Sequence, residues 1–204
     1  MNAFIKRLMD ILVAASALLV MSPLMALVAV AITMSMGQPV LFRQMRPGHE
    51  GRPFALLKFR TMNELCDEQG RLLPDAQRLT PLGSLLRRLS VDELPQLWNV
   101  LRGDMSLVGP RPLLMQYLDR YTRDQARRHE VKPGLTGWAQ IHGRNGLSWP
   151  QKFALDIWYV DNRGLRLDTW ILFRTLWQVV KREGISQPGH ATVLEFSGRE
   201  GDER

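Results

Sequence analysis

The sequence predicts an α-rich α+β protein: a kinked, re-entrant membrane helix, a short β-hairpin and a cytoplasmic helical domain with interfacial amphipathic helices. Three observations predict this class. The run from Ile11 to Met34 carries no charged residue and exceeds the about 20 residues that cross a bilayer core. Two short apolar segments then flank a loop of turn-forming residues. Several later segments carry apolar residues at helical spacing.

The apolar run is expected to break at its centre, where Ser22 precedes Pro23. A proline inside a helix removes one backbone hydrogen bond and clashes with the preceding turn, so the helix should kink there. The hydroxyl of Ser22 can help to satisfy the carbonyl that Pro23 leaves without a donor. The run therefore predicts two helical arms that meet at Pro23.

Basic residues lie beyond both ends of the run, with Lys6 and Arg7 before it and Arg43 and Arg46 after it. Basic flanks prefer the cytoplasm, and a straight span would place one pair on the opposite side. A helix that dips into one leaflet and returns keeps both pairs in the cytoplasm. We therefore expect a re-entrant anchor. A kinked but complete transmembrane helix and a signal peptide are the alternatives.

Composition bounds the remaining chain. The 204 residues carry a net charge of +7, which indicates anionic partners such as lipid, nucleotide or nucleic acid. The single cysteine, Cys66, excludes an intrachain disulfide, and no ligand spacing typical of structural zinc occurs. We divide the chain into an anchor (1–38), one further domain (39–190) and a polar C-terminal tail (191–204).

A β-hairpin is expected directly after the anchor. Its strands would cover 39–45 and 53–60, joined by the proline- and glycine-containing loop 46–52. Lys58 and Arg60 would share one face of the second strand, because side chains alternate along a strand.

Helices are predicted from apolar spacing over most of the remaining chain. Their expected ranges are 81–89, 92–102, 113–129, 151–162 and 168–183. Residues 63–80 are polar and predict a surface excursion, and 132–150 predict a long structured loop of the kind that often carries function. The last helix combines tryptophans with basic residues, so it suits either a bilayer interface or a core position.

The densest charge cluster runs from Arg87 to Pro95 and contains the adjacent carboxylates Asp92 and Glu93. One carboxylate could hold a divalent cation while the other acts as nucleophile or base, because Mg²⁺ takes one or two protein carboxylates alongside substrate phosphates. The alternative is helix capping: Ser90 and Glu93 have capping-box spacing, and Asp92 could cap a helix that starts later.

Three further residues are candidates with weaker signals. Arg111 stands between two prolines, which hold the backbone and lower the entropy cost of aiming its guanidinium at a phosphate. Asp168 at the start of the last helix is either a site residue or a helix cap. His142 and Arg144 lie in the glycine-rich loop, and their spacing assigns them no role.

Five ordered motifs together resemble the bacterial sugar transferases, the monotopic phosphoglycosyl transferases. They are Lys58-Phe59-Arg60-Thr61-Met62, Ser90 to Val100, Gly103-Asp104-Met105-Ser106, Val108 to Pro112, and Lys132 to Gln140. The resemblance covers nearly the whole chain. The chain is similar in length to the small members of the family, such as the undecaprenyl-phosphate bacillosamine-phosphate transferase.

The resemblance implies a reaction at the cytoplasmic face of the bacterial inner membrane. A sugar 1-phosphate would pass from a UDP-sugar to undecaprenyl phosphate, with release of UMP. The implied nucleophile is Asp92, which would form a phosphosugar-aspartate, and Glu93 with Asp92 would hold Mg²⁺. Lys58, Arg87 and Arg111 match positions near the phosphates, and Asp168 matches an acidic site residue. The domain 39–190 would then be catalytic.

Several alternatives stay open. An N-acetylated amino sugar is the first expectation for the substrate, with galactose or glucose second. A non-catalytic membrane adaptor, an enzyme that releases UDP and a nucleic-acid binder are rivals, although no nucleic-acid motif occurs, so we expect no nucleic-acid partner. The sequence does not indicate an oligomeric state.

Overall fold

The computed structural model of the protein describes residues 3–143, 146–181 and 196–198. The elements in chain order, with η for 3₁₀ helices, are α1 (Ala3–Met36), β1 (Leu41–Pro47), η1 (His49–Gly51), β2 (Pro53–Phe59), α2 (Asp75–Arg78), α3 (Pro81–Arg88), η2 (Val91–Glu93), α4 (Gln96–Arg102), β3 (Ser106–Val108), η3 (Met115–Arg120), α5 (Arg123–Ala126), η4 (Arg127–Glu130), β4 (Gly134–Thr136), α6 (Trp138–Ile141), α7 (Trp149–Asn162) and α8 (Leu165–Lys181). The strands form two small sheets, β1–β2 antiparallel and β3–β4 parallel. The helix-rich fold with a β-hairpin is therefore confirmed.

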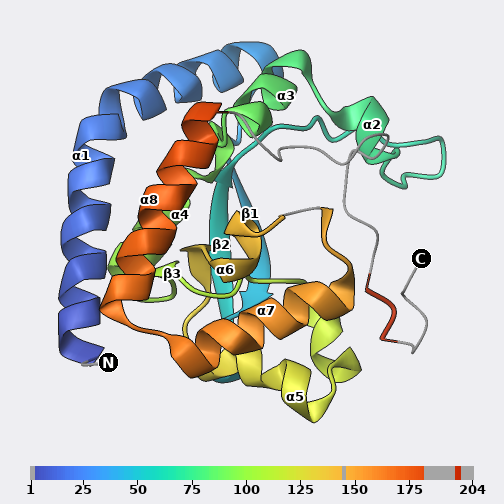
Figure 1. Ribbon diagram of the computed structural model, residues 1–204. Coiled ribbons are helices and arrows are strands. Elements are labelled where there is room, and N and C mark those ends of the chain that lie inside the picture. The colour runs from blue at the N-terminus through green and yellow to red at the C-terminus, as the bar shows by residue number, and fades with distance from the viewer. Residues whose placement is uncertain (1–2, 144–145, 182–195, 199–204) are drawn as a thin grey trace.

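Helix α1 is one continuous element that contains Pro23. Figure 1 shows that it bends, so that its second part runs over the top of the molecule. The hydroxyl of Ser22 donates to the carbonyl oxygen of Leu19 at 2.8 Å. In a regular helix that carbonyl would accept the amide hydrogen that Pro23 lacks. The predicted role of Ser22 is confirmed, while the path of α1 through a membrane stays a prediction.

Most of the apolar surface of α1 is exposed. Its most apolar window has a mean hydropathy of 2.4, and only 11% of that window is buried. Leu19 and Leu27 are 76% and 68% exposed, whereas Ala14 and Ile32 lie on a narrow face that is fully buried against the domain. At 1.5 Å per residue the helix is about 51 Å long, well beyond the about 30 Å of a bilayer core. A long, exposed apolar helix of this kind is suited to a membrane.

Both ends of α1 are bonded to the same domain. Near the N-terminal end, the Arg7 guanidinium donates to the carbonyl oxygens of Val100 and Leu101 at 2.6 and 2.7 Å. At the C-terminal end, Arg60 donates to the carbonyl oxygens of Met36, Gly37 and Gln38. A basic side chain that donates hydrogen bonds to the last carbonyl oxygens of a helix stabilises that terminus. Arg60 therefore holds the C-terminal end of α1, and its role differs from that of Lys58 two residues earlier.

The predicted hairpin is confirmed, with β1 and β2 paired from Leu41 opposite Phe59 to Pro47 opposite Pro53. Helix α4 attaches to β2 through the side chain of Asn99, which is 1% exposed. Its Oδ1 accepts from the Leu57 amide at 3.1 Å, and its Nδ2 donates to the Ala55 carbonyl at 2.8 Å. The amide thus replaces a neighbouring strand along this edge of β2.

The stretch 103–112 and the expected loop 132–150 together form a small sheet that the sequence did not predict. In it, β3 runs parallel to β4, with Ser106 opposite Gly134 and Val108 opposite Thr136. The two backbones approach so closely that a Cβ on Gly134 would lie 2.1 Å from the amide nitrogen of Gly109. Glycine is therefore required here, and the sheet brings the two glycine-containing motifs together.

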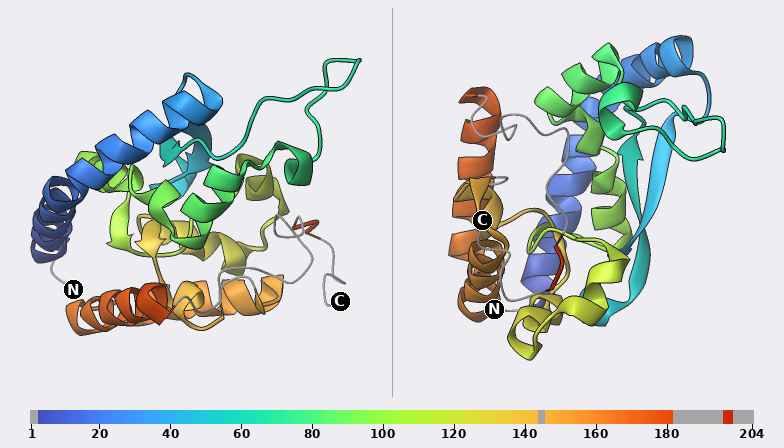
Figure 2. Two further views of the ribbon diagram at one scale, coloured as in Figure 1. Left: turned by 90° about the horizontal axis from the view of Figure 1, so that it is seen from above. Right: turned by 90° about the vertical axis from the view of Figure 1, so that its right-hand side faces the viewer.

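Helices α7 and α8 confirm the last two predicted helices, although they begin two and three residues earlier than expected, and 182–183 lie outside the described residues. In the right-hand view of Figure 2 they lie on one side of the molecule and the β1–β2 hairpin lies on the other. Helix α8 buries Ile171 completely, while Trp170, Phe173, Leu176 and Trp177 are 44–67% exposed. The core interpretation is confirmed for one face of α8, and the bilayer-interface interpretation stays a prediction for the face that exposes large apolar side chains.

The single helix predicted over 113–129 is wrong, because three short pieces, η3, α5 and η4, occupy this stretch. Tyr121 has extended backbone, and Thr122 starts a new helix with a complete capping box that includes Gln125. A cap of this kind satisfies the first amides of a new helix and so favours a break in the old one. The apolar spacing was nevertheless informative, since Tyr117 and Tyr121 both face one aromatic cluster.

That aromatic cluster receives a residue from the tail, which had been predicted only as polar. Phe196 is 5% exposed and lies among Tyr117, Tyr121, Trp149 and Phe153, with ring centroids 5.0 to 5.9 Å apart. Its amide donates to the Tyr117 hydroxyl at 3.1 Å, and its carbonyl accepts from Arg120. The rest of the tail, apart from Ser197 and Gly198, lies outside the described residues.

We expect Phe196→Ala to lower the free energy of unfolding by about 3 kcal/mol, because it removes a fully packed aromatic ring. Chemical denaturation of the detergent-solubilised protein measures this change. Phe173→Ala, at a position 65% exposed, is the matched control and should change stability far less. Equal effects of the two substitutions would show that the cluster does not hold the tail.

Candidate active site

Glu93 is the centre of a tight ionic cluster. Lys58 Nζ lies 2.8 Å from its Oε1, and the Arg111 guanidinium donates to both of its oxygens. Burial alone would raise the pKa of Glu93, but Arg111 and Lys58 together hold it far below its ordinary value. Glu93 is therefore ionised at neutral pH, and it fixes two cations that come from β2 and from the loop before η3.

Asp92 next to it is held differently. Asp92 is 7% exposed, and within the described residues no side chain or backbone amide donates a hydrogen bond to its carboxylate. Burial, and then the charge of Glu93, raise the pKa of Asp92, while Lys58, Arg87 and Arg111 oppose that rise. A poorly solvated carboxylate without a hydrogen-bond partner is a better nucleophile than a solvated one, because it has few water molecules or hydrogen bonds to lose before it reacts.

Local backbone geometry presents this pair. Ser90 adopts a left-handed conformation with φ of +55°, and a single 3₁₀ turn, Val91–Glu93, comes directly after it. Such a conformation is unfavourable for a serine and concentrates at functional sites. Pro95 then stands at the N-cap of α4, so the helix predicted from residue 92 begins only at Gln96. The cause is that proline is tolerated at a helix start but not inside.

The capping alternative for this motif is wrong. Ser90 makes no side-chain hydrogen bond to the turn after it, and the N-cap of α4 is Pro95, which has no capping side chain. Glu93 bonds to two cations rather than to a backbone amide. The acidic residues of this motif are therefore not explained by helix termination.

Arg87 reaches the site from the end of α3. Its Nε donates to the Thr61 hydroxyl at 3.1 Å, and its charge acts on the carboxylate of Asp92. Helix α3 can lie this close to Thr61 because position 83 is glycine: a Cβ there would lie 1.9 Å from the Thr61 carbonyl oxygen. Together with Lys58 and Arg111, Arg87 makes three cations around two carboxylates, an excess of positive charge suited to a phosphate group.

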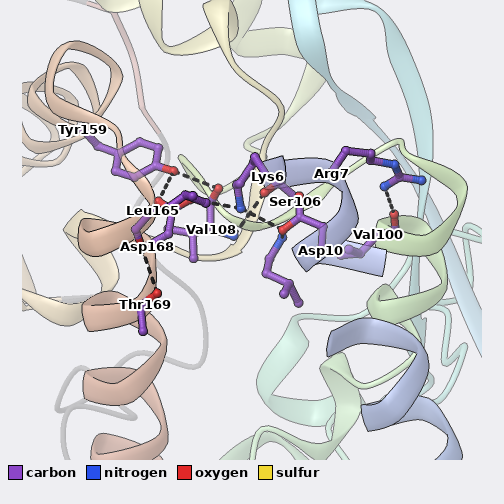
Figure 3. Close-up of polar contacts among 11 residues, drawn as sticks. Lys6, Arg7, Asp10, Val100, Ser106, Val108, Tyr159, Leu165, Asp168 and Thr169 are labelled. Carbon is purple, nitrogen blue, oxygen red and sulfur yellow. Dashed lines mark hydrogen bonds and ion pairs between the residues drawn. The ribbon is translucent and has the colours of Figure 1, made fainter. Parts of the chain in front are cut away.

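Asp168 has other partners. Figure 3 shows it in a separate buried network that joins α1 to α8. Lys6 Nζ lies 2.7 Å from Asp10 Oδ1 and 3.1 Å from Asp168 Oδ2, and the Tyr159 hydroxyl lies 2.8 Å from Asp168 Oδ1. Asp168 is completely buried and is the fourth residue of α8, so it is no helix cap. No contact links it to Asp92 or Glu93 within the described chain, and its part in substrate binding stays a prediction.

Several members of these networks were not predicted from the sequence. Lys6 and Asp10 are four residues apart at the edge of the apolar run, which is the spacing of a helical ion pair and was available as a signal. Asn99 and Tyr159 gave no such signal, because their partners are backbone atoms and side chains distant in sequence. Of the glycine-rich loop residues, His142 bonds through Nδ1 to the Trp138 carbonyl at 2.9 Å. Arg144 lies outside the described residues.

The donor set fits a magnesium ion better than a dedicated metal cage. Within the described residues, no group of three or more acidic, histidine or cysteine side chains could hold a metal by itself. Asp92 has both carboxylate oxygens without a bonded partner, and Glu93 Oε2 has only a 3.4 Å contact with Arg111. Mg²⁺ commonly binds through one or two carboxylates and completes its shell with water and phosphate oxygens.

The structure thus joins a long, exposed apolar helix, of a length and composition suited to a membrane, to a carboxylate pair surrounded by cations. The chain belongs to the bacterial sugar transferase family, whose model matches residues 1–182. It is 55% identical to the uncharacterized sugar transferase EpsL of Bacillus subtilis, over 95% of this chain and 96% of that protein.

Two further relatives have more specific names. The chain is 44% identical to the UDP-glucose:undecaprenyl-phosphate glucose-1-phosphate transferase of Caulobacter vibrioides, over 84% of this chain and 68% of the relative. It is 42% identical to the UDP-N-acetylgalactosamine-undecaprenyl-phosphate N-acetylgalactosaminephosphotransferase of Aeromonas hydrophila, over 85% of this chain but only 43% of the relative.

Proposed function

We propose that this protein transfers a sugar 1-phosphate from a UDP-sugar to undecaprenyl phosphate and releases UMP. The observation that carries the proposal is the site itself: a buried Asp92, with no bonded partner among the residues that the structure describes, beside a Glu93 that two cations hold in place. The family is one of sugar transferases, and relatives bear the names of undecaprenyl-phosphate sugar phosphotransferases. The chain is accordingly a polyprenyl-phosphate phosphoglycosyl transferase.

The proposed chemistry has two displacements at one phosphorus atom. A carboxylate oxygen of Asp92 attacks the β-phosphorus of the UDP-sugar, and the bond from that phosphorus to the bridging oxygen breaks. UMP leaves with the electron pair of that bond, and a phosphosugar-aspartate remains. An oxygen of undecaprenyl phosphate then attacks the same phosphorus and displaces Asp92 as a carboxylate. Throughout, Lys58, Arg87 and Arg111 stabilise the phosphate charge, which is the main task in phosphoryl transfer.

Asp92 and Glu93 are the residues that would hold Mg²⁺, Asp92 through its carboxylate and Glu93 through Oε2, whose contact with Arg111 is long at 3.4 Å. A bound magnesium ion supplies neutralisation of the diphosphate charge. The cluster alone has one more positive charge than negative, so the protein contributes to the same neutralisation without the metal.

The sugar is proposed to be an N-acetylated amino sugar, with glucose and galactose as the second choice. The names of relatives include all three kinds, since N-acetylgalactosamine, glucose and galactose each occur among them. A panel of UDP-sugars is therefore part of any test.

The test of the proposed function is the nucleotide product. Detergent-solubilised protein is incubated with undecaprenyl phosphate, Mg²⁺ and each UDP-sugar, and released nucleotide is separated by chromatography. We expect UMP with at least one sugar, with at most one equivalent per protein in the absence of undecaprenyl phosphate and repeated turnover only in its presence. Release of UDP would establish ordinary glycosyl transfer and overturn the proposal, and a purified, folded protein that releases neither nucleotide with any panel member would favour the membrane adaptor.

The contacts of α1 support the re-entrant anchor and a cytoplasmic catalytic domain at the inner membrane. Arg7 at one end and Met36 at the other both bond to the same domain, to α4 and to Arg60 respectively. A helix whose two ends touch one polar domain can enter and leave the membrane only on one side. The exposed apolar face of α8 would rest on that same surface.

We expect Phe4→Cys and Gln38→Cys, each in a Cys66→Ser background, to resist an impermeant maleimide in intact spheroplasts and to react after permeabilisation. Leu72→Cys, in an exposed part of the domain, reports the side of the domain itself. Labelling of Phe4→Cys alone from outside would establish the complete transmembrane helix.

A further inference from the structure

The loop that carries Arg111 is held from behind by a second, buried arginine. Nη2 of Arg128 donates to the backbone carbonyl oxygen of Arg111 at 2.9 Å. Arg128 is 3% exposed and lies in η4, whereas the guanidinium of Arg111 points away from this contact to Glu93. The same residue is thus bonded at its backbone by one cation and at its side chain by the carboxylate of the site.

Arg128 is itself fixed on every side. Its Nε and Nη2 bond to Oδ2 of Asp156 in α7 at 3.1 and 2.6 Å, and its Nη1 lies 3.2 Å from the Tyr121 hydroxyl. Asp156 is 4% exposed. The planar guanidinium can serve all three partners at once because its donors have a fixed geometry, which a lysine ammonium does not reproduce.

Such a buried ion pair is a poor source of stability by itself. Removing two charges from water costs about as much as their attraction returns, and apolar residues of similar volume often serve as well or better. The stability gained by holding η4 to α7 therefore does not explain the Arg128–Asp156 ion pair. The bond to the Arg111 carbonyl provides an explanation, since a charged donor to a backbone carbonyl is stronger than a neutral one.

We infer that Arg128 and Asp156 are positioning residues for Arg111. They fix the backbone between Pro110 and Pro112 so that the Arg111 guanidinium is held over Glu93, where a phosphate of the donor substrate must arrive. This inference rests on the proposed function, because it assigns the Arg111 guanidinium to the substrate diphosphate. Neither Arg128 nor Asp156 touches the substrate in this scheme, as both are buried behind the loop.

The test replaces the pair without leaving a buried charge. Arg128→Met with Asp156→Leu removes both charges together, and Arg128→Lys keeps a charge near Asp156 but lacks the fixed planar donors that bond Asp156, Tyr121 and the Arg111 carbonyl at once. The dissociation constant for the UDP-sugar is measured in an Asp92→Asn background, where binding proceeds without turnover. We expect each change to weaken binding about tenfold when Arg111 is present and to have no further effect when Arg111 is replaced by alanine.

A matched control lies in the same two elements. Arg127 and Asp161 also join η4 to α7 by an ion pair, but their side chains are 38% and 48% exposed and neither contacts Arg111. Arg127→Gln with Asp161→Asn should leave binding unchanged. Thermal denaturation of every variant separates loss of binding from loss of fold.

Equal weakening of binding with and without Arg111, or no weakening in a folded variant, would overturn the inference and leave a purely structural ion pair. Failure of the proposed function gives a different result: the wild-type protein would then release no UMP, and the Asp92→Asn protein with an intact pair would not bind the UDP-sugar.

Discussion

Asp92→Asn is expected to lower the rate of UMP release by about 1,000-fold or more, equivalent to at least about 4 kcal/mol of transition-state stabilisation. The amide has almost the same shape as the carboxylate, but it is not a nucleophile towards phosphorus. The fold should survive, because burial and Glu93 already disfavour the ionised form of Asp92 and a neutral amide avoids that cost. Initial rates at saturating UDP-sugar, together with a thermal unfolding curve, measure the two effects separately.

A matched control and a second readout make this result specific. Asp119→Asn, at an exposed aspartate in η3, should retain the wild-type rate. With a UDP-sugar radiolabelled in the sugar and no lipid phosphate, the wild-type protein should retain label after denaturation, whereas Asp92→Asn should retain none. An Asp92→Asn protein that still turns over and still retains label would show that the nucleophile is another group.

Lys6→Met is expected to have the second largest effect, a loss of about 3–5 kcal/mol of stability, because it removes the cation from a buried network. The Asp10 and Asp168 carboxylates, 3% and 0% exposed, would then face each other without a counter-charge. The N-terminal part of α1 should detach from α8, and the free energy of unfolding in detergent should fall accordingly. Chemical denaturation and protease sensitivity near the N-terminus measure these two changes.

The control removes the acids as well. Lys6→Met combined with Asp10→Asn and Asp168→Asn leaves no buried charge, so it should recover most of the lost stability. Equal losses for the single and the triple variant would mean that Lys6 contributes through packing of its stem, and the network would then have no electrostatic role.

Local chemistry explains which parts of the fold were predictable. Ser22 next to Pro23 predicted a hydroxyl bond to the carbonyl that Pro23 leaves without a donor, because this effect acts within one turn of helix. The hairpin and the last two helices were equally accessible, since periodicity and turn residues report local geometry. The helix predicted over 113–129 failed where a cap at Thr122 outweighed the apolar spacing. The parallel β3–β4 sheet was not predicted, because its partners lie far apart in sequence.

The features of the candidate site likewise separate into those that the sequence predicts and those that depend on tertiary contacts. By itself the sequence determined the adjacent carboxylates Asp92 and Glu93 and, through the order of its short motifs, the family and the cations that the resemblance places near the phosphates. Only the tertiary structure decided that Glu93 is held by Lys58 and Arg111 while Asp92 has no bonded partner in the described part of the chain. It also decided that Asp168 bonds to α1 and that Arg128 reaches the Arg111 carbonyl. Each of these outcomes depends on which distant side chains share a buried space, and burial sets the strength of every charge in it.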